Sequence, residues 1–165
     1  PDDVLESLVA GIASTHGFRH GQLVAHTSGR YGISVLQPAA LQGAYVMALH
    51  PAMTFVGTST DLDRLNACPF GVTADDSAIA VAQALVIEMG AEPITISEED
   101  RDKYFEAISV ASSFSSMIVN QSIGMLEEIG IEAAPSVLAP LIRSSVEVAL
   151  SQGHKPIDPT ELLES

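Results

Sequence analysis

Hydrophobic and polar positions follow helical spacing and strand spacing in turn over the first half of the chain. After the acidic pair Asp2-Asp3, apolar residues recur at spacings of one, three and four, which predicts an amphipathic helix. Short apolar runs bounded by turn residues predict four buried strands. These strands are expected at residues 22–27, 45–50, 70–73 and 93–96.

Helical patterns occupy the segments between these strands. A weaker pattern covers residues 33–41, and a short one covers residues 61–65. The third is better defined, because Asp75-Asp76-Ser77 can cap its start and Gly90 can end it. An alternation of strands and helices predicts parallel or mixed pairing in one sheet, with helices packed against it.

The pattern changes character after Ser97. The run Ser-Glu-Glu-Asp at 97–100 signals the start of a helix, and no proline interrupts the chain from there to Gly130. Small hydroxylated residues at 111–116 suit close helix packing or contact with a ligand, and a further amphipathic helix is expected at 135–152. The chain therefore predicts an α/β part of about four strands with flanking helices at 1–97, an all-α part at 98–153 and a flexible tail at 154–165.

Charge and composition exclude several classes of partner. The 165 residues include 21 acidic and 7 basic side chains, a formal net charge of −14, so nucleic acid and anionic membranes would be repelled. Hydrophobic residues make up 47% of the chain and charged residues only 17%, which indicates apolar surface left for a partner or a dimer interface.

Cysteine use and the start of the chain favour the cytoplasm. The single cysteine, Cys68, cannot form an internal disulfide and lies beside a predicted buried strand. No run reaches the ~18 apolar residues of a membrane span. The first residues, Pro1-Asp2-Asp3, also differ from the basic start of a signal peptide.

The first candidate site is the run His26-Thr27-Ser28-Gly29 at the carboxyl end of a predicted strand. Ligands of open α/β sheets bind in the crevice outside these strand ends. A histidine, a serine and an exposed glycine backbone there can donate hydrogen bonds to a carboxylate or carbonyl oxygen. The alternative is structural, with Ser28 capping the next helix and His26 satisfied in the core.

The second candidate is His50-Pro51, again at a strand end, followed by Thr54. If the two strands are parallel neighbours, His26 and His50 come to one edge of the sheet. Two histidines without a third ligand do not favour a metal site. Here too the alternative is a plain turn, in which Pro51 fixes the chain.

Other sites are not supported by the sequence. It contains no glycine-rich dinucleotide loop, phosphate loop or hydrolase nucleophile elbow. Neighbouring carboxylates lie at predicted helix ends, where the helix dipole or solvent accounts for them. They are Asp75-Asp76, Glu98-Glu99-Asp100 and Glu127-Glu128. With so few arginines to meet a phosphate, little of a nucleotide site is expected in this chain.

The run HTSG at 26–29, the run LHPAMTF at 49–55 and the helix near Lys103-Tyr104 together resemble a known family. They are similar to Rossmann-like proteins with a C-terminal domain of unknown function 2520, relatives of 6-phosphogluconate dehydrogenase, pyrroline-carboxylate reductase and ketopantoate reductase. The resemblance runs from Pro1 to about Gly153. It implies that residues 1–97 are the last part of a dinucleotide-binding domain, whose glycine-rich loop would precede residue 1.

The resemblance also implies a function. It points to an oxidoreductase that uses NADP or NAD to transfer hydride to a 2-oxo acid or an imine, with cofactor binding that needs the full-length protein. Its helical domain would supply substrate contacts and a homodimer interface. The implied crevice residues are His26, Thr27, Ser28, Gly29, Pro51 and Thr54, and the implied catalytic residues are His50 and Ser113.

One departure from the family pattern bears on catalysis. The family shows Tyr-His followed eight residues later by Asn, where this chain has Tyr104-Phe105 and Ser113. A serine at that position could hold a substrate oxygen only with shorter reach. The alternative function is therefore a non-catalytic dimerisation or ligand-sensing module of the same fold.

Overall fold

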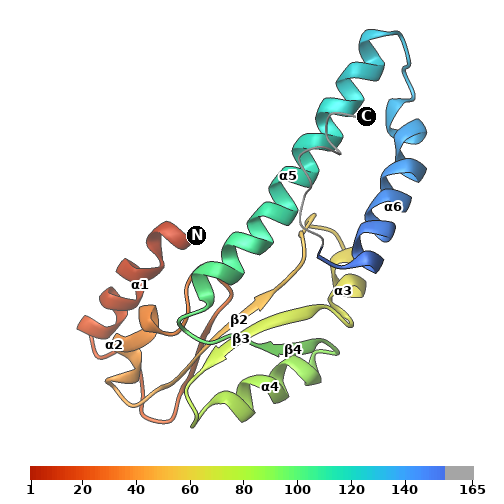
Figure 1. Cartoon of the computed structure of the whole chain (residues 1–165). Helices are drawn as coiled ribbons and strands as arrows, with labels where there is room; N and C mark the ends of the chain where they lie inside the picture. The colour runs from red at the N-terminus through yellow and green to blue at the C-terminus, as the bar shows by residue number, and fades with distance from the viewer. Residues whose placement is uncertain (155–165) are drawn as a thin grey trace. The chain divides into compact units, whose positions relative to one another are not determined.

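The computed structural model describes residues 1–154, and its first part is a four-stranded sheet with helices on both faces (Figure 1). The strand order is β1-β2-β3-β4. Most of the tail predicted at 154–165 lies outside the described residues. The strands are β1 (Leu23–His26), β2 (Tyr45–Pro51), β3 (Pro69–Ala74) and β4 (Glu92–Thr95).

Strand pairing makes the sheet mixed. β1 runs parallel to β2, β2 runs antiparallel to β3, and β3 runs parallel to β4. The two central strands β2 and β3 are buried along most of their length, because helices cover both faces of the sheet. The prediction of an α/β sheet followed by helices is thus confirmed. The sequence allowed either parallel or mixed pairing, and the structure shows mixed pairing.

Each face of the sheet packs against its own helices. α4 (Ile79–Glu88) covers one face, where Met47, Leu49 and Val72 form a buried cluster with Ala82 and Val86 of the helix. The other face packs, around Val46, against α1 (Asp2–Ser14), the 3₁₀ turn η1 (Ser34–Leu36) and α2 (Gln37–Ala40). The helix predicted at 33–41 is thus one 3₁₀ turn and one short helix.

The predicted cap at the start of α4 is wrong, whereas the predicted end of this helix at Gly90 is confirmed. The N-cap is Ala78, with no side-chain cap, so Asp75-Asp76-Ser77 do not cap this helix. Instead the main-chain oxygen of Asp75 accepts bonds from the N–H groups of Ala78 (2.8 Å) and Ile79 (2.9 Å), so that a backbone turn leads into the helix. Gly90 follows the helix with φ +77°, a conformation that favours glycine.

Two longer helices follow the sheet, α5 (Arg101–Glu128) and α6 (Ala134–Gln152). The described chain divides into two compact units, residues 1–112 and the residues from Ser113 onward, so the first turns of α5 belong to the sheet unit. The domain boundary at residue 97 stays a prediction. A short helix, α3 (Thr60–Leu65), follows the loop after β2 and confirms the pattern at 61–65.

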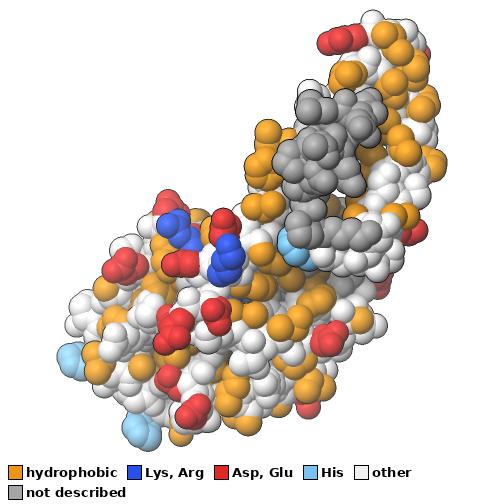
Figure 2. All heavy atoms as spheres, viewed as in Figure 1, with side chains coloured by type: hydrophobic (Ala, Val, Ile, Leu, Met, Phe, Trp, Pro, Cys, Tyr) orange, Lys and Arg blue, Asp and Glu red, His pale blue; other side chains and the backbone are white. Residues whose placement is uncertain are grey.

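Large apolar side chains are exposed along the second unit. Met117, Ile129 and Leu141 are between 63% and 72% exposed, and Figure 2 shows hydrophobic side chains spread over both helices. An apolar cleft of about 230 Å³ lies between α5 and α6. Within the described residues, no helix combines the length and hydropathy needed to cross a membrane.

Truncation of Met47 tests the core of the sheet. Met47 is 0% exposed, so Met47→Ala should lower the free energy of unfolding by about 2–5 kcal/mol, through lost burial and the cavity left behind. The control Met89→Ala makes the same change at a side chain that is 45% exposed, and should cost less than about 0.5 kcal/mol. Urea unfolding monitored by circular dichroism measures both, and equal losses would contradict this placement of the core.

Candidate functional site

The turn after β1 is closed by its own side chains. His26 is 8% exposed, and the main-chain N–H of Ser28 donates to its Nδ1 (3.2 Å). Nε2 of His26 therefore carries the hydrogen and donates to the carbonyl of Gly32 (2.7 Å). The hydroxyl of Ser28 accepts bonds from the N–H groups of Arg30 and Tyr31. The alternative of a satisfied histidine thus describes the contacts of His26, but Ser28 closes the turn rather than capping a helix.

The two histidine motifs come together at one edge of the sheet. β1 and β2 are parallel neighbours, and His26 pairs with Ala48, two residues before His50. Gly29 lies against the imidazole of His50, since a Cβ built on Gly29 would come 2.8 Å from Nε2. The glycine of the first motif is therefore what allows this close approach.

Tyr104, in the first turn of α5, contacts His50. Its hydroxyl lies 2.8 Å from Nδ1 of His50, and the two rings meet edge to face with centroids 5.6 Å apart. Gly71 is the residue of the neighbouring strand β3 that pairs with His50, and a Cβ built on Gly71 would come 2.7 Å from the phenol of Tyr104. The missing side chain at Gly71 gives the phenol access to His50.

Arg101, also in the first turn of α5, is buried next to His50 and Tyr104 and is only 2% exposed. Nε donates to the hydroxyl of Thr73 (2.8 Å), and Nη2 donates to the carbonyls of Gly71 (3.0 Å) and Ala48 (3.2 Å). Nη1 lies 3.5 Å from the carbonyl of Gly29. The guanidinium carbon is also 5.5 Å from the ring centroid of Tyr104, within the range of a cation–π contact.

Glu98 fixes the far end of the same turn. Its two carboxylate oxygens accept from the N–H groups of Ile33 (2.7 Å) and Ser34 (3.0 Å). A Cβ at Gly32 would overlap this carboxylate. Burial opposes ionisation of Glu98, but these bonds outweigh it and lower its pKa. Glu98 is therefore a specific partner of the turn, where the sequence analysis attributed it to the helix dipole or solvent.

Burial sets the protonation of the site. It lowers the pKa of His50, and Arg101 lowers that pKa further, while Asp2 raises it. Burial also lowers the pKa of His26 and raises the pKa of Tyr104. At neutral pH both imidazoles are therefore uncharged and the phenol keeps its proton, and a hydrogen bond joins the Tyr104 hydroxyl to Nδ1 of His50.

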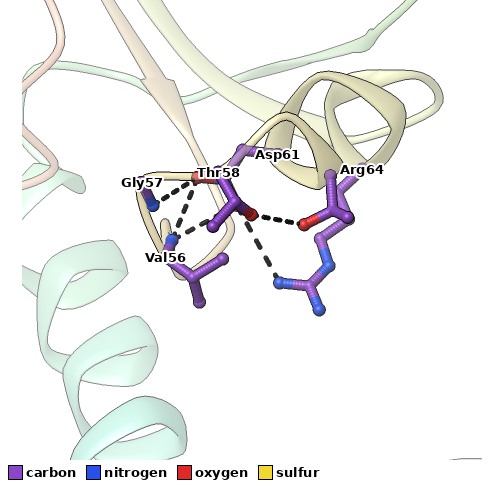
Figure 3. A network of polar contacts seen from close by, with 6 residues as sticks. Val56, Gly57, Thr58, Asp61 and Arg64 are labelled. Carbon is purple, nitrogen blue, oxygen red and sulfur yellow. Dashed lines mark hydrogen bonds and ion pairs between the residues drawn. The ribbon is translucent and has the colours of Figure 1, made fainter.

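Asp61 holds the loop that follows His50-Pro51. Its carboxylate is 7% exposed and accepts from the N–H groups of Gly57 (2.8 Å) and Val56 (3.0 Å) (Figure 3). Burial opposes its ionisation, but bonds from Val56, Gly57 and Thr58, together with nearby Arg64, hold its pKa below the ordinary 3.8. The loop carrying Thr54 is thus closed by one ionised carboxylate.

The other predicted residues lie in different surroundings. Thr27 and Thr54 are exposed on the two loops, where a ligand could reach them. Pro51 is buried, and strand alternation directs its ring to the face opposite His50, so its part in the site is to fix the backbone. Ser113 is exposed and is the first residue of the second unit, so its catalytic role stays a prediction.

The sequence analysis assigned no role to Glu98 or Arg101, and used Tyr104 only as a family landmark. A signal was present, because Glu98, Arg101 and Tyr104 recur every three residues and so share one face at the start of the helix. What the sequence could not show is that this face meets β2, β3 and the turn after β1. Asp61 gave no comparable signal, since its partners are main-chain groups.

A separate cavity of about 610 Å³ lies at the carboxyl ends of β3 and β4. Its lining includes Thr73, Asp75, Asp76 and Glu98, but neither histidine of the site. Three carboxylates make this cavity unfavourable for a phosphate. Within the described residues, no group of three or more His, Cys, Asp or Glu side chains could hold a metal ion.

Family comparison fits this architecture. Residues 68–157, more than half of the chain, match the family described as Domain of unknown function (DUF2520). The chain belongs to the DUF2520 family. Residues 1–51 match a Rossmann-like domain, and this part includes β1, β2 and both candidate histidines. No curated protein matches this DUF2520 chain in sequence.

Solved structures share the fold of this DUF2520 protein at low sequence identity. The protein TM1727 from Thermotoga maritima is 17% identical over 93% of the chain, with a TM-score of 0.69. The candidate NADP oxidoreductase BF3122 from Bacteroides fragilis is 19% identical over 89% of the chain, with a TM-score of 0.71. Plasmodium falciparum pyrroline carboxylate reductase with NADP bound is 12% identical over 98% of the chain, with a TM-score of 0.59. The DUF2520 chain spans 57%, 54% and 61% of these three proteins, respectively.

The protonation of the two histidines can be measured directly. His26 and His50 should titrate below the ordinary 6.5, because burial disfavours their charged forms. The unfolded chain then takes up these protons first, so stability should begin to fall as the pH is lowered through 6.5. Long-range ¹⁵N–¹H NMR spectra should show the hydrogen of His26 on Nε2, with the urea-unfolded chain as reference. A His26 hydrogen on Nδ1, or midpoints at or above the reference, would contradict the geometry.

Proposed function

We propose that the full-length protein is an NAD(P)-dependent oxidoreductase that reduces a carbonyl or imine group, with a 2-oxo acid or a cyclic imine as substrate class. The observation that carries this proposal is the half-buried, hydrogen-bonded pair of His50 and Tyr104 at the carboxyl ends of β1 and β2. Ligands of open α/β sheets bind outside such strand ends. The Rossmann-like match and the fold shared with pyrroline carboxylate reductase support the same assignment.

The residues present suit only one end of a dinucleotide. The exposed Thr27 and the hydroxyl of the half-buried Ser28 offer uncharged hydrogen-bonding groups of the kind that a nicotinamide carboxamide requires. Gly29, whose backbone was expected to be exposed, is buried against His50 and leaves no main-chain group open there. A pyrophosphate needs a glycine-rich loop at a helix N-terminus, and we propose that residues preceding this chain in the full-length protein supply it. The nicotinamide end is the same in NADP and NAD, so both remain candidate cofactors of the full-length protein.

The chain's own part in the reaction is to hold and release a proton. The bound cofactor would supply the hydride. Tyr104 keeps its proton at neutral pH and lies beside His50, so its hydroxyl is the donor for a substrate oxygen or nitrogen that becomes negative. The resulting phenolate recovers a proton from solvent. Ser113 stays the predicted second catalytic residue, and its hydroxyl would hold a substrate oxygen.

Substitution of Tyr104 tests this function. In the full-length protein, NADPH oxidation should be measured by absorbance with a panel of 2-oxo acids and cyclic imines. Tyr104→Phe keeps the ring but removes the proton, and should lower kcat by about 10²–10⁴-fold. The control Tyr45→Phe makes the same change at a side chain that is 42% exposed, and should leave kcat unchanged. A folded protein that oxidises neither NADPH nor NADH with any of these substrates would refute the proposal.

A second copy of the chain is the partner that we propose for the helical unit. Large apolar side chains lie exposed along α5 and α6, which is more apolar surface than a monomer usually leaves in water. The same observation favours the alternative function, a non-catalytic dimerisation module. The kinetics of Tyr104→Phe distinguish the two, because a module without chemistry shows no turnover to lose.

A charge placed on this surface tests the dimer. Leu141→Glu should shift the protein from dimer to monomer in light scattering after gel filtration, because a buried unpaired carboxylate is strongly unfavourable. Leu141 is 63% exposed in the described chain, so its own fold should tolerate the change. Leu62→Glu, on α3 and 74% exposed, is the control outside the helical unit and should leave the mass unchanged. A wild-type protein that is already monomeric would contradict the dimer.

A further inference from the structure

Arg101 is a buried cation whose hydrogen-bond partners are all uncharged. The guanidinium is 2% exposed and bonds to one hydroxyl and to main-chain carbonyls. In residues 1–154, the ion pairs within 4.0 Å join Arg64 to Asp61 and Lys103 to Glu106, and none includes Arg101. Glu98 lies beyond ion-pair distance but still favours the charged form of Arg101. Taking a charge out of water without a carboxylate in direct contact is costly, so stability alone is a poor reason for an arginine here.

The groups that Arg101 contacts are the ones that surround His50. Ala48 precedes His50 by two residues on β2, and Gly71 is its pairing partner on β3. Gly29 lies against the imidazole, and the hydroxyl of Tyr104 is hydrogen-bonded to it. One planar guanidinium thus reaches β2, β3, the turn after β1 and the ring of Tyr104 at once.

We propose that Arg101 is a positioning residue, which holds His50 and Tyr104 in hydrogen-bonding geometry by tying these four segments together. The fixed, planar fork of arginine suits this task, because it presents several donors in directions that a lysine ammonium does not reproduce. The Nη1 contact to Gly29, at 3.5 Å, is the longest of the four hydrogen bonds of Arg101. The proposal concerns the resting protein and holds whether or not the protein is a reductase.

The positive charge of Arg101 also affects the pKa of His50. The charged and titratable groups that face His50 are Arg101 and Tyr104 from α5 and Asp2 from α1, while Cys68 acts on Tyr104. Arg101 favours neutral His50, and Asp2 favours its charged form. Loss of the guanidinium should therefore raise the pKa of His50, whereas an arginine that only fills space would leave it unchanged.

Two substitutions of Arg101 separate geometry from charge. With ¹⁵N-labelled histidine and ¹³C-labelled tyrosine, NMR of the full-length protein reports the titration of His50 and the NOE between His50 and the Tyr104 ring. Arg101→Met should raise the midpoint of His50 and abolish this NOE. Arg101→Lys keeps the charge but loses the fork, so the midpoint should stay low while the NOE weakens. Arg19→Met removes an exposed arginine and should change neither signal.

Thr73→Val keeps the proposal testable if the Arg101 variants do not fold. It replaces the 3%-exposed hydroxyl that anchors Nε with a methyl group of similar size, and leaves the arginine in place. The NOE between His50 and Tyr104 should weaken while the His50 midpoint stays low. An unchanged NOE in Thr73→Val, or an unchanged NOE and midpoint in a folded Arg101→Met, would overturn the proposal.

Discussion

The burial of one guanidinium against main-chain carbonyls of β2 and β3 organises the sheet unit of this protein. The carbonyls of Ala48 and Gly71, in the two central strands, each accept a hydrogen bond from Nη2 of Arg101. These bonds fix the first turn of α5 on the sheet. Once α5 is held there, Tyr104 reaches His50, and Glu98 reaches the turn that also packs on His50.

Three glycines leave room for the side chains of the site, where any larger residue would clash. A Cβ at Gly29 would meet His50, one at Gly71 would meet Tyr104, and one at Gly32 would meet Glu98. Backbone conformation is not the reason, because none of the three adopts a positive φ. Each of these glycines instead provides room for a side chain that arrives from a distant part of the sequence.

Membership of the DUF2520 family and the fold shared with solved structures place this chain in a recognised architecture. Identities of 12% to 19% support the fold, so the chemistry has to be argued from this chain's own groups. Those groups are an uncharged imidazole, a protonated phenol and a buried cation. They suit binding and proton transfer to a neutral or anionic polar group better than they suit binding a metal cation.

The sequence by itself determined the order of helices and strands, the mixed or parallel α/β sheet and the two histidines at adjacent strand ends. These features depend on local periodicity and on chain order, which act over a few residues. Only the tertiary structure decided that β3 runs antiparallel to β2, and that Glu98, Arg101 and Tyr104 belong to the site. The partners of these three lie between 28 and 72 residues away along the chain, where spacing no longer predicts contact. The burial and the charge that lower the pKa of His50 likewise act only once the chain has folded.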